Sequence, residues 1–145
     1  MYQEANVGRK TFYRYFKNKE AVLERALELL FLEYTSLKDN YYLPQYEDLL
    51  YHHFHFWSGY TEYLRILYKN DLMFYLFKQY QKYIPKLNHE YRSQKSLNNK
   101  VSDYANAFTI GIFWSILYTW VENGTKESAK ELVEVYSTFI NNKVE

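Results

Sequence analysis

Residues 8–20 read GRKTFYRYFKNKE, and this stretch decides the prediction of the fold. Phe12 and Phe16 lie four residues apart, which puts them on one face of a helix that begins after Gly8. Lys17-Asn18 predicts a break, because asparagine is a good N-cap for a following helix. The stretch therefore predicts a short basic helix, a turn and the start of a second helix.

Apolar residues after the break recur at intervals of three and four, as an amphipathic helix requires. They predict a helix that runs to about Leu37 and ends before Asp39-Asn40. Its apolar face consists of Val22, Leu23, Ala26, Leu27, Leu30, Phe31 and Tyr34.

The middle of the chain predicts three further helices. The first has Pro44 in its first turn and ends near Trp57 before Ser58-Gly59; its inward residues are Leu49, Leu50, His53, Phe54 and Trp57. The second covers residues 60–69, with Tyr63, Leu64 and Leu67 on one side. The third is capped by Asn70-Asp71, is kinked or broken at Pro85 and resumes to about Arg92.

Two helices are expected at the C-terminal end. Residues 93–100 are polar and predict a solvent loop, after which Ser102 or Asp103 caps a helix that ends near Glu122. Asn123-Gly124 supplies its C-terminal stop. The last helix begins after Thr125 and carries Leu132, Val133, Tyr136, Phe139 and Ile140 on its apolar face.

Composition agrees with an all-α fold. The chain has 145 residues, enough for one compact domain with a sizeable core, and only 4 Gly and 2 Pro, too few for a turn-rich β-sandwich. It has no cysteine, which excludes disulfides and thiolate chemistry and suits a reducing cytoplasm. No secretory signal opens the chain, and the most apolar stretch, 108–121, is too short to span a bilayer. We therefore expect a cytoplasmic protein without membrane contact.

Charge is unevenly distributed along the chain. The net charge is +1, but residues 1–19 alone carry a balance of +4, from Arg9, Lys10, Arg14, Lys17 and Lys19 against Glu4. The remaining residues carry −3. A basic end on a mildly acidic body fits a head that binds a polyanion, and a solvated basic helix has the same appearance.

The sequence motif separates these two interpretations. Residues 11–20, followed by an apolar helix, closely resemble the helix-turn-helix of TetR-family regulators, and Ala5-Asn6-Val7-Gly8 resembles the turn before the recognition helix. The resemblance implies an all-α, TetR-like helical bundle. Residues 1–38 form a partial DNA-binding region with its connecting helix, and residues 39–145 form an effector-binding and dimerisation domain. Residues 104–112 and 120–125 look like the C-terminal half of the group named after dihydroxyacetone kinase regulators.

The resemblance also assigns roles to residues. A recognition helix presents its N-terminal side chains to base edges in the major groove of double-stranded DNA, while flanking groups hold phosphates. The positions that match these roles are Arg9, Lys10, Thr11, Tyr13, Tyr15 and Lys19. Gly8 replaces the usual Ser or Thr and removes a side-chain cap.

The implied function is a transcriptional regulator, a repressor that binds operator DNA as a dimer and is released by a small-molecule effector. The family has a full helix and most of a second before this block. The alternative is therefore a dimeric helical module, binding a ligand or a protein, that has lost DNA binding with its first helices.

Effector and dimer surfaces are expected in the body. Aromatic side chains with polar tips suit a mostly apolar ligand, and the candidate pocket residues are His53, Trp57, Tyr60, Tyr63, Tyr75, Phe108 and Trp114. The last two helices supply a self-complementary dimer interface through Phe113, Leu117, Trp120, Val133, Tyr136 and Ile140. Ordinary core packing is the alternative for both sets.

Other kinds of site find little support. His52, His53 and His55 lie on one helix, where neighbouring positions point in different directions, so we expect no metal site. The chain has no cysteine nucleophile, nucleophile elbow or Gly-rich phosphate loop. We therefore expect no cofactor and no enzymatic activity.

Overall fold

The structure is a computed structural model that describes the backbone of residues 2–38, 46–94 and 98–141, and the side chains of residues 14, 18–36, 47–86, 98–139 and 141. Its described elements are six α-helices without a strand, so the predicted all-α class is confirmed. They are α1 (Tyr2–Lys38), α2 (Tyr46–Ser58), α3 (Thr61–Lys69), α4 (Met73–Gln94), α5 (Asn99–Glu122) and α6 (Ala129–Asn141). Of these helices, none is long and apolar enough to cross a membrane.

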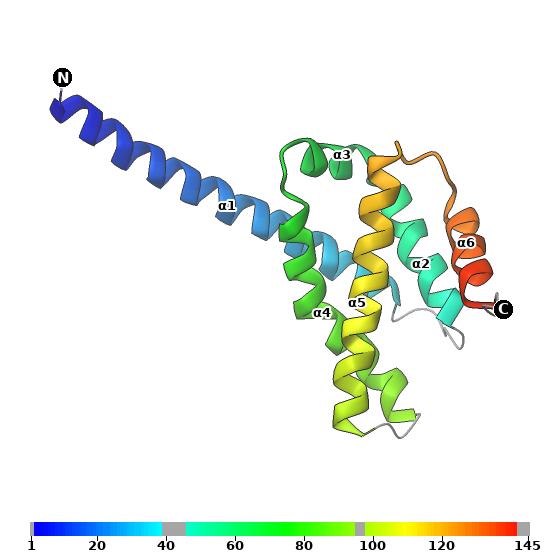
Figure 1. Cartoon of the computed structure of the whole chain (residues 1–145). Helices are drawn as coiled ribbons and strands as arrows, with labels where there is room; N and C mark the ends of the chain where they lie inside the picture. The colour runs from blue at the N-terminus through cyan, green and yellow to red at the C-terminus, as the bar shows by residue number, and fades with distance from the viewer. Residues whose placement is uncertain (1, 39–45, 95–97, 142–145) are drawn as a thin grey trace.

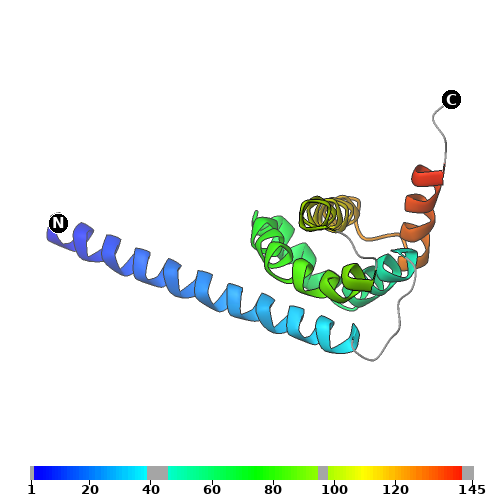
Figure 2. The ribbon, with the colours of Figure 1, turned by 90° about the horizontal axis from the view of Figure 1, so that it is seen from below.

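The body of the molecule is a bundle in which α4 and α5 lie side by side and α6 packs on α2 (Figure 1). The helix α1 packs on α4 with its C-terminal half, and its N-terminal half extends beyond the rest of the chain (Figures 1 and 2). The body and the C-terminal half of α1 therefore form one unit, and the basic N-terminal half projects from it.

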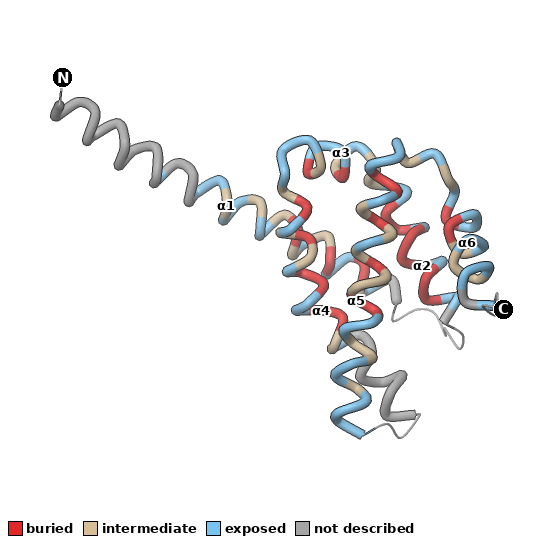
Figure 3. Tube along the Cα trace, in the orientation of Figure 1, coloured by how far each residue is buried: buried red, intermediate tan, exposed pale blue. Residues whose placement is uncertain are grey.

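A single apolar core joins the helices. Its fully buried members come from all of the first five helices, for example Phe31, Trp57, Leu64, Tyr80 and Phe113. Figure 3 shows this burial concentrated where α1, α2, α4 and α5 face one another. The predicted inward residues of α2 are all buried, and so is Phe56, which the pattern did not include.

The predicted break at Lys17-Asn18 is wrong, because α1 continues through it as one helix. Asn18 is exposed rather than packed in a turn. An asparagine or glycine inside a helix costs about 0.5–1 kcal/mol relative to alanine, which alone does not end a helix. A turn at this point needs a tertiary contact to favour it, and the ribbon of the body lies away from residues 2–18 (Figure 2).

The turn between α3 and α4 also differs from the prediction. Asp71 adopts a positive φ of 57°, and the Leu72 N–H donates to the Leu67 carbonyl at 2.8 Å. The Asp71 N–H donates to the Tyr68 carbonyl at 3.2 Å, which completes a Schellman motif. Asn70-Asp71 therefore ends α3, whereas we expected it to cap α4. Pro85 does not end α4, which continues to Gln94.

Local caps fix the bounds of the last two helices. The Asn98 side chain accepts the Val101 N–H at 2.9 Å, so the predicted caps Ser102 and Asp103 are wrong. Gly124, with φ 86°, ends α5 as predicted. The start of α6 is not Thr125 but Ser128, whose Oγ accepts the Glu131 N–H at 3.1 Å while the Glu131 carboxylate accepts the Ser128 N–H at 3.4 Å. This is a complete capping box, three residues later than expected.

Candidate functional site

The six residues predicted to contact DNA all lie on the N-terminal half of α1. The side chains of Arg9, Lys10, Thr11, Tyr13 and Tyr15 lie outside the described residues, and Lys19 is exposed. On one continuous helix, positions 11, 15 and 19 form one row and positions 9 and 13 form another. Position 10 is rotated by about 100° around the helix axis from position 9, on the side of the second row. The set therefore occupies two separate strips of α1 rather than one face.

Polar contacts join α1 to the body at three places. The Tyr75 hydroxyl of α4 donates to the Glu20 carboxylate. Lys82 of α4 lies 3.9 Å from Glu28, and the Tyr60 hydroxyl donates to both Glu33 oxygens at 2.8–2.9 Å. The hydrogen bond to Glu33 raises the pKa of Tyr60. These contacts run along α1 from Glu20 to Glu33 and fix its direction relative to α4 and to Tyr60, which precedes α3.

Apolar contacts anchor the same half of α1. Leu27, Phe31 and Tyr34 are buried in the core. Phe31 stacks on Tyr83 with ring centroids 5.6 Å apart and meets the edge of Tyr80 at 5.1 Å. Burying side chains of this size stabilises by about 1.5–3 kcal/mol each, so apolar packing, more than the exposed polar contacts, holds α1 in place.

A polar cluster lies inside this core. His53 is fully buried, its Nε2 lies 2.7 Å from the Tyr80 hydroxyl, and its ring stacks on Phe113 at 4.1 Å. Tyr34 meets the His53 ring edge-on, with centroids 6.0 Å apart. Burial lowers the pKa of His53 well below its usual range, and the charge of His52 lowers it further. Burial raises the pKa values of Tyr34 and Tyr80, so all three groups are uncharged at neutral pH.

The predicted effector residues do not converge on one place. His53 and Trp57 are buried in the core, and the ring centroids of Tyr60 and Trp57 lie 6.3 Å apart. Trp114 lies between α4 and α5, where its indole N–H donates to the Met73 carbonyl at 3.1 Å. Tyr75 contacts α1, Tyr63 is half-buried, and Phe108 is 56% exposed. The structure thus places Trp57 and Tyr60 side by side, buries His53 against Tyr80 and Phe113, and places the others elsewhere.

Sequence reasoning missed two partners of His53. Tyr34 belongs to the predicted apolar face of its helix, and that periodicity gave no sign of its polar neighbourhood. Tyr80 lies on the third helix predicted for the middle of the chain, where the pattern assigned it no role. The pairing of residues 53 and 80 crosses 27 positions, and no local pattern specifies it.

The three histidines of α2 meet different neighbours. The His52 ring lies 5.3 Å from Tyr34, His53 contacts Tyr80 and Phe113, and exposed His55 stacks on Tyr51 at 5.6 Å. Within the described part of the chain, no three His, Asp or Glu side chains gather as metal ligands. The structure therefore gives each ring a packing partner of its own.

The residues predicted for the dimer interface divide into two groups. Phe113, Leu117 and Trp120 are buried within the chain itself, as the alternative of core packing describes. Val133 and Tyr136 are half-buried on α6, and the side chain of Ile140 lies outside the described residues. The apolar side chains that α5 and α6 expose are Val101, Tyr104, Phe108, Val135 and Phe139.

A surface pocket of about 460 Å³ lies between α2 and the start of α6. Its walls include Tyr51 and His55 of α2, and Lys126, Glu127 and Lys130 beside α6. None of the predicted effector residues is part of its lining.

Comparisons with known families match both parts of the chain. Residues 45–142 match the family described as the transcriptional regulator C-terminal region, and residues 2–26 match bacterial regulatory proteins of the tetR family. No curated protein and no solved structure matches the chain. The C-terminal match covers more than half of the chain and includes α2 to α6.

Proposed function

The chain belongs to the TetR family of bacterial transcriptional regulators, which are not enzymes, and from this premise we propose that it is a repressor that binds operator DNA as a dimer and is released by a small-molecule effector. The observation that carries the proposal is that α1 is a single helix, with the basic motif at one end and core residues at the other. A change in the core thus acts on the helix that carries the DNA-facing positions.

The DNA-facing end has the charge that the proposal needs. Residues 1–19 carry a balance of +4, and the exposed residues of this segment include Arg14 and Lys19. Basic side chains on an extended helix bind phosphates, and an arginine such as Arg9 reads guanine through two hydrogen bonds. We assign Arg9, Lys10, Thr11 and Tyr13 to the groove, and Tyr15 and Lys19 to the backbone of the DNA.

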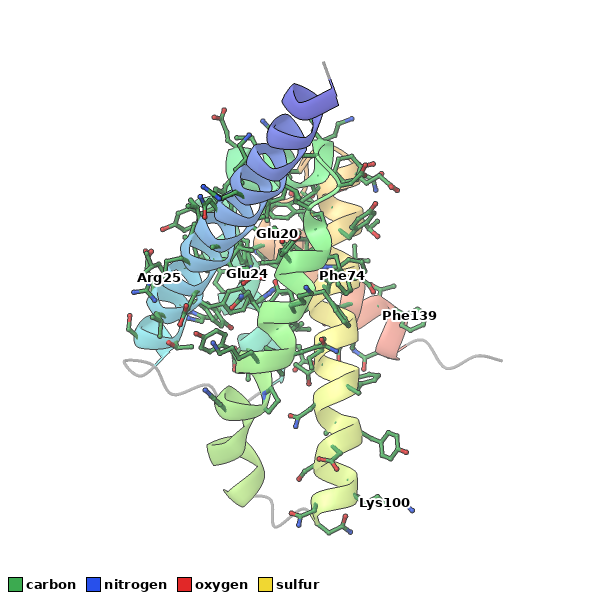
Figure 4. All side chains as sticks on the ribbon, turned by 90° about the vertical axis from the view of Figure 1, so that its left-hand side faces the viewer. Glu20, Glu24, Arg25, Phe74, Lys100 and Phe139 are labelled. Carbon is green, nitrogen blue, oxygen red and sulfur yellow. The ribbon has the colours of Figure 1, made fainter. Side chains whose placement is uncertain are left out.

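The dimer follows from geometry. Two recognition helices reach half-sites roughly one DNA turn apart only if two copies associate through a closed two-fold interface. We propose that α5 and α6 form it, with Val133, Tyr136 and Ile140 joined by the exposed Val135 and Phe139. Phe139 is 79% exposed and stands out from α6 (Figure 4), so a second copy reaches it without unfolding the body.

The effector acts by binding the released state more tightly than the DNA-bound state. We propose that it binds among the middle helices, around His53, Trp57 and Tyr60. Movement there shifts α1 through its contacts with Tyr60 and α4 and changes the spacing of the two DNA-facing ends.

The placement of the DNA-facing positions favours a second function. Along the single helix of residues 2–38 they occupy two strips rather than one face. A module that uses α2–α6 to dimerise and to bind a ligand, without reading DNA, agrees with that geometry.

DNA binding separates the two functions. Fluorescence anisotropy of the chain with duplexes from the region upstream of its gene is expected to show binding that is sequence-selective and weakens with salt. Tyr13→Ala and Lys19→Ala each weaken it, while circular dichroism remains unchanged. Lys100→Ala is the matched control, because this exposed lysine lies at the N-terminal end of α5, away from α1 (Figure 4). Binding that ignores sequence, or both α1 variants at wild-type affinity, contradicts the repressor.

Sedimentation velocity tests the dimer. Phe139→Asp is expected to shift the chain from dimer to monomer, because it places a charge in the proposed apolar interface. Phe74→Asp is the control, since Phe74 is 58% exposed but stands on α4 (Figure 4). A dimer that survives the first change and dissociates with the second places the interface on α4 instead.

A further inference from the structure

The core cluster of Tyr34, His53 and Tyr80 contains polar atoms that the protein leaves unpaired. The Tyr34 hydroxyl and His53 Nδ1 find no hydrogen-bond partner among the described residues, although both side chains are at least 97% buried. Buried polar groups are almost always hydrogen-bonded, because an unpaired one has lost its water without compensation. Two unpaired groups on adjacent rings indicate a partner that the chain itself does not supply.

The hydrogen bond between His53 and Tyr80 limits what this partner offers. His53 Nε2 lies 2.7 Å from the Tyr80 hydroxyl, and which of the two donates depends on the tautomer of the imidazole. Where Nε2 accepts, the neutral ring carries its proton at Nδ1, and where Nε2 donates, Nδ1 is an acceptor. The unpaired Tyr34 hydroxyl both donates and accepts. A hydroxyl oxygen therefore satisfies His53 Nδ1 in either tautomer, and a carbonyl oxygen accepts from Tyr34 or from a protonated Nδ1.

The surroundings of the cluster define the rest of the ligand. Aromatic rings enclose it: Phe113 stacks on His53, and Phe31 meets Tyr80 edge-on. Of the described residues, no Asp, Glu, Lys or Arg side chain is buried. A carboxylate or an ammonium group taken into this core finds no opposite charge that is fully buried with it, and such burial is strongly unfavourable. An uncharged aromatic ring that carries one oxygen atom enters this core without burying a charge.

We propose that the effector site is centred on Tyr34, His53 and Tyr80, and that its ligand is an uncharged aromatic molecule bearing a hydroxyl or carbonyl oxygen. The inference rests on the proposed function, and it adds the chemical class of the effector and Tyr34 as a residue that contacts it. Tyr34 belongs to α1, the helix that carries the DNA-facing positions. The ligand therefore contacts that helix itself, as well as the helices packed against it.

Four small probes test the charge rule on the full chain by isothermal calorimetry at neutral pH. Phenol is expected to bind, toluene to bind more weakly because it lacks the oxygen, and benzoate and benzylammonium not to bind. Benzoate or benzylammonium binding as tightly as phenol overturns the proposal, and so does the absence of phenol binding. This part uses the wild-type chain and does not depend on the folding of any variant.

A matched pair of variants tests the residues. Tyr34→Phe removes one hydroxyl, and we expect about tenfold weaker phenol binding, the loss of one hydrogen bond to the ligand, with toluene binding unchanged. Tyr104→Phe removes an exposed hydroxyl of α5 and is expected to change neither. Equal phenol affinity in Tyr34→Phe and the wild type overturns the assignment of Tyr34.

Nitrogen NMR of the imidazoles gives an independent readout. The His53 signals are assigned by their loss in His53→Gln, and phenol is expected to shift the Nδ1 resonance of His53 and not that of exposed His55. An unmoved His53 signal under saturating phenol contradicts the site. All three experiments omit DNA, so a chain that binds phenol but no operator refutes the proposed repressor and keeps this site. The reverse result refutes only this site.

Discussion

The two halves of α1 belong to one helix and experience opposite environments. From Leu27 to Tyr34 the helix is part of the core and touches aromatic residues of α2 and α4. From residue 2 to residue 18 the helix extends beyond the rest of the chain (Figure 2). The N-terminal half contains the motif that resembles the TetR family, and the side chains of the C-terminal half stabilise the fold by packing in the core.

The difference indicates that the residues proposed to bind DNA and the residues that stabilise the fold lie in different halves of α1. Substitutions in the C-terminal half are expected to change the free energy of unfolding, whereas substitutions in the N-terminal half are expected to change DNA binding and leave stability intact. The predictions below test that division, beginning with the largest effect.

Phe31→Ala is expected to lower the free energy of unfolding by about 3–5 kcal/mol, because it leaves a cavity between α1, α2 and α4. Its neighbour Leu32→Ala is the matched control, since Leu32 is 45% exposed and its loss is expected to cost under about 1 kcal/mol. Urea unfolding measures both. Similar losses for the two residues contradict the assigned face of α1.

Stability is expected to decrease as the pH is lowered below about 6.5, the usual pKa of histidine. Burial holds the pKa of His53 below that value in the folded chain, so in this range the unfolded state binds more protons. The free energy of unfolding therefore falls by up to about 1.4 kcal/mol for each pH unit until the folded pKa is reached. Urea titrations at several pH values measure the slope.

The slope is assigned by replacing the histidine. In His53→Gln we expect it to shrink, and in His55→Gln, which alters an exposed ring, we expect it to remain. If the free energy of unfolding of His53→Gln depends on pH as steeply as that of the wild type, the His53 ring is protonated in the folded chain without penalty. That result contradicts the uncharged core.

Helix caps give the smallest effect and the sharpest contrast between the body and α1. Ser128→Ala breaks the capping box of α6 and is expected to cost about 1 kcal/mol. Asn18→Ala is expected to cost nothing and to gain a few tenths of a kcal/mol in helix propensity, because Asn18 lies within α1. Urea unfolding and far-UV circular dichroism follow both. A loss of about 1 kcal/mol on Asn18→Ala restores Asn18 as an N-cap and breaks α1 in two.

Periodicity predicted much of the body. The inward set of α2 was correct because its polar and apolar faces are distinct, and Asn123-Gly124 marked the end of α5 because glycine readily adopts the positive φ that the turn needs. The surface of α5 was not predictable in this way. Its apolar residues occupy several faces, so spacing alone did not tell buried Phe113 from exposed Phe108.

The candidate site was predicted only in part. His53 was predicted as an inward residue of its helix and as part of the effector pocket. Tyr34 was predicted only as part of an apolar face and Tyr80 was assigned no role, because their contact with His53 depends on how three helices meet. The unbroken α1 was missed for a related reason. Asn18 is compatible with a cap or with a helix interior, and tertiary contact decides between the two.

The continuity of α1 is the central claim, and a distance between two spin labels tests it most directly. The chain has no native cysteine, so Arg14→Cys with Ser36→Cys accepts labels at exposed positions of α1 alone. A continuous helix separates these residues by about 33 Å at 1.5 Å per residue. We predict one narrow peak near that distance in the free chain. A peak at or below roughly 27 Å, the length of residues 18–36 alone, contradicts a single helix that joins the proposed DNA-facing end to the core.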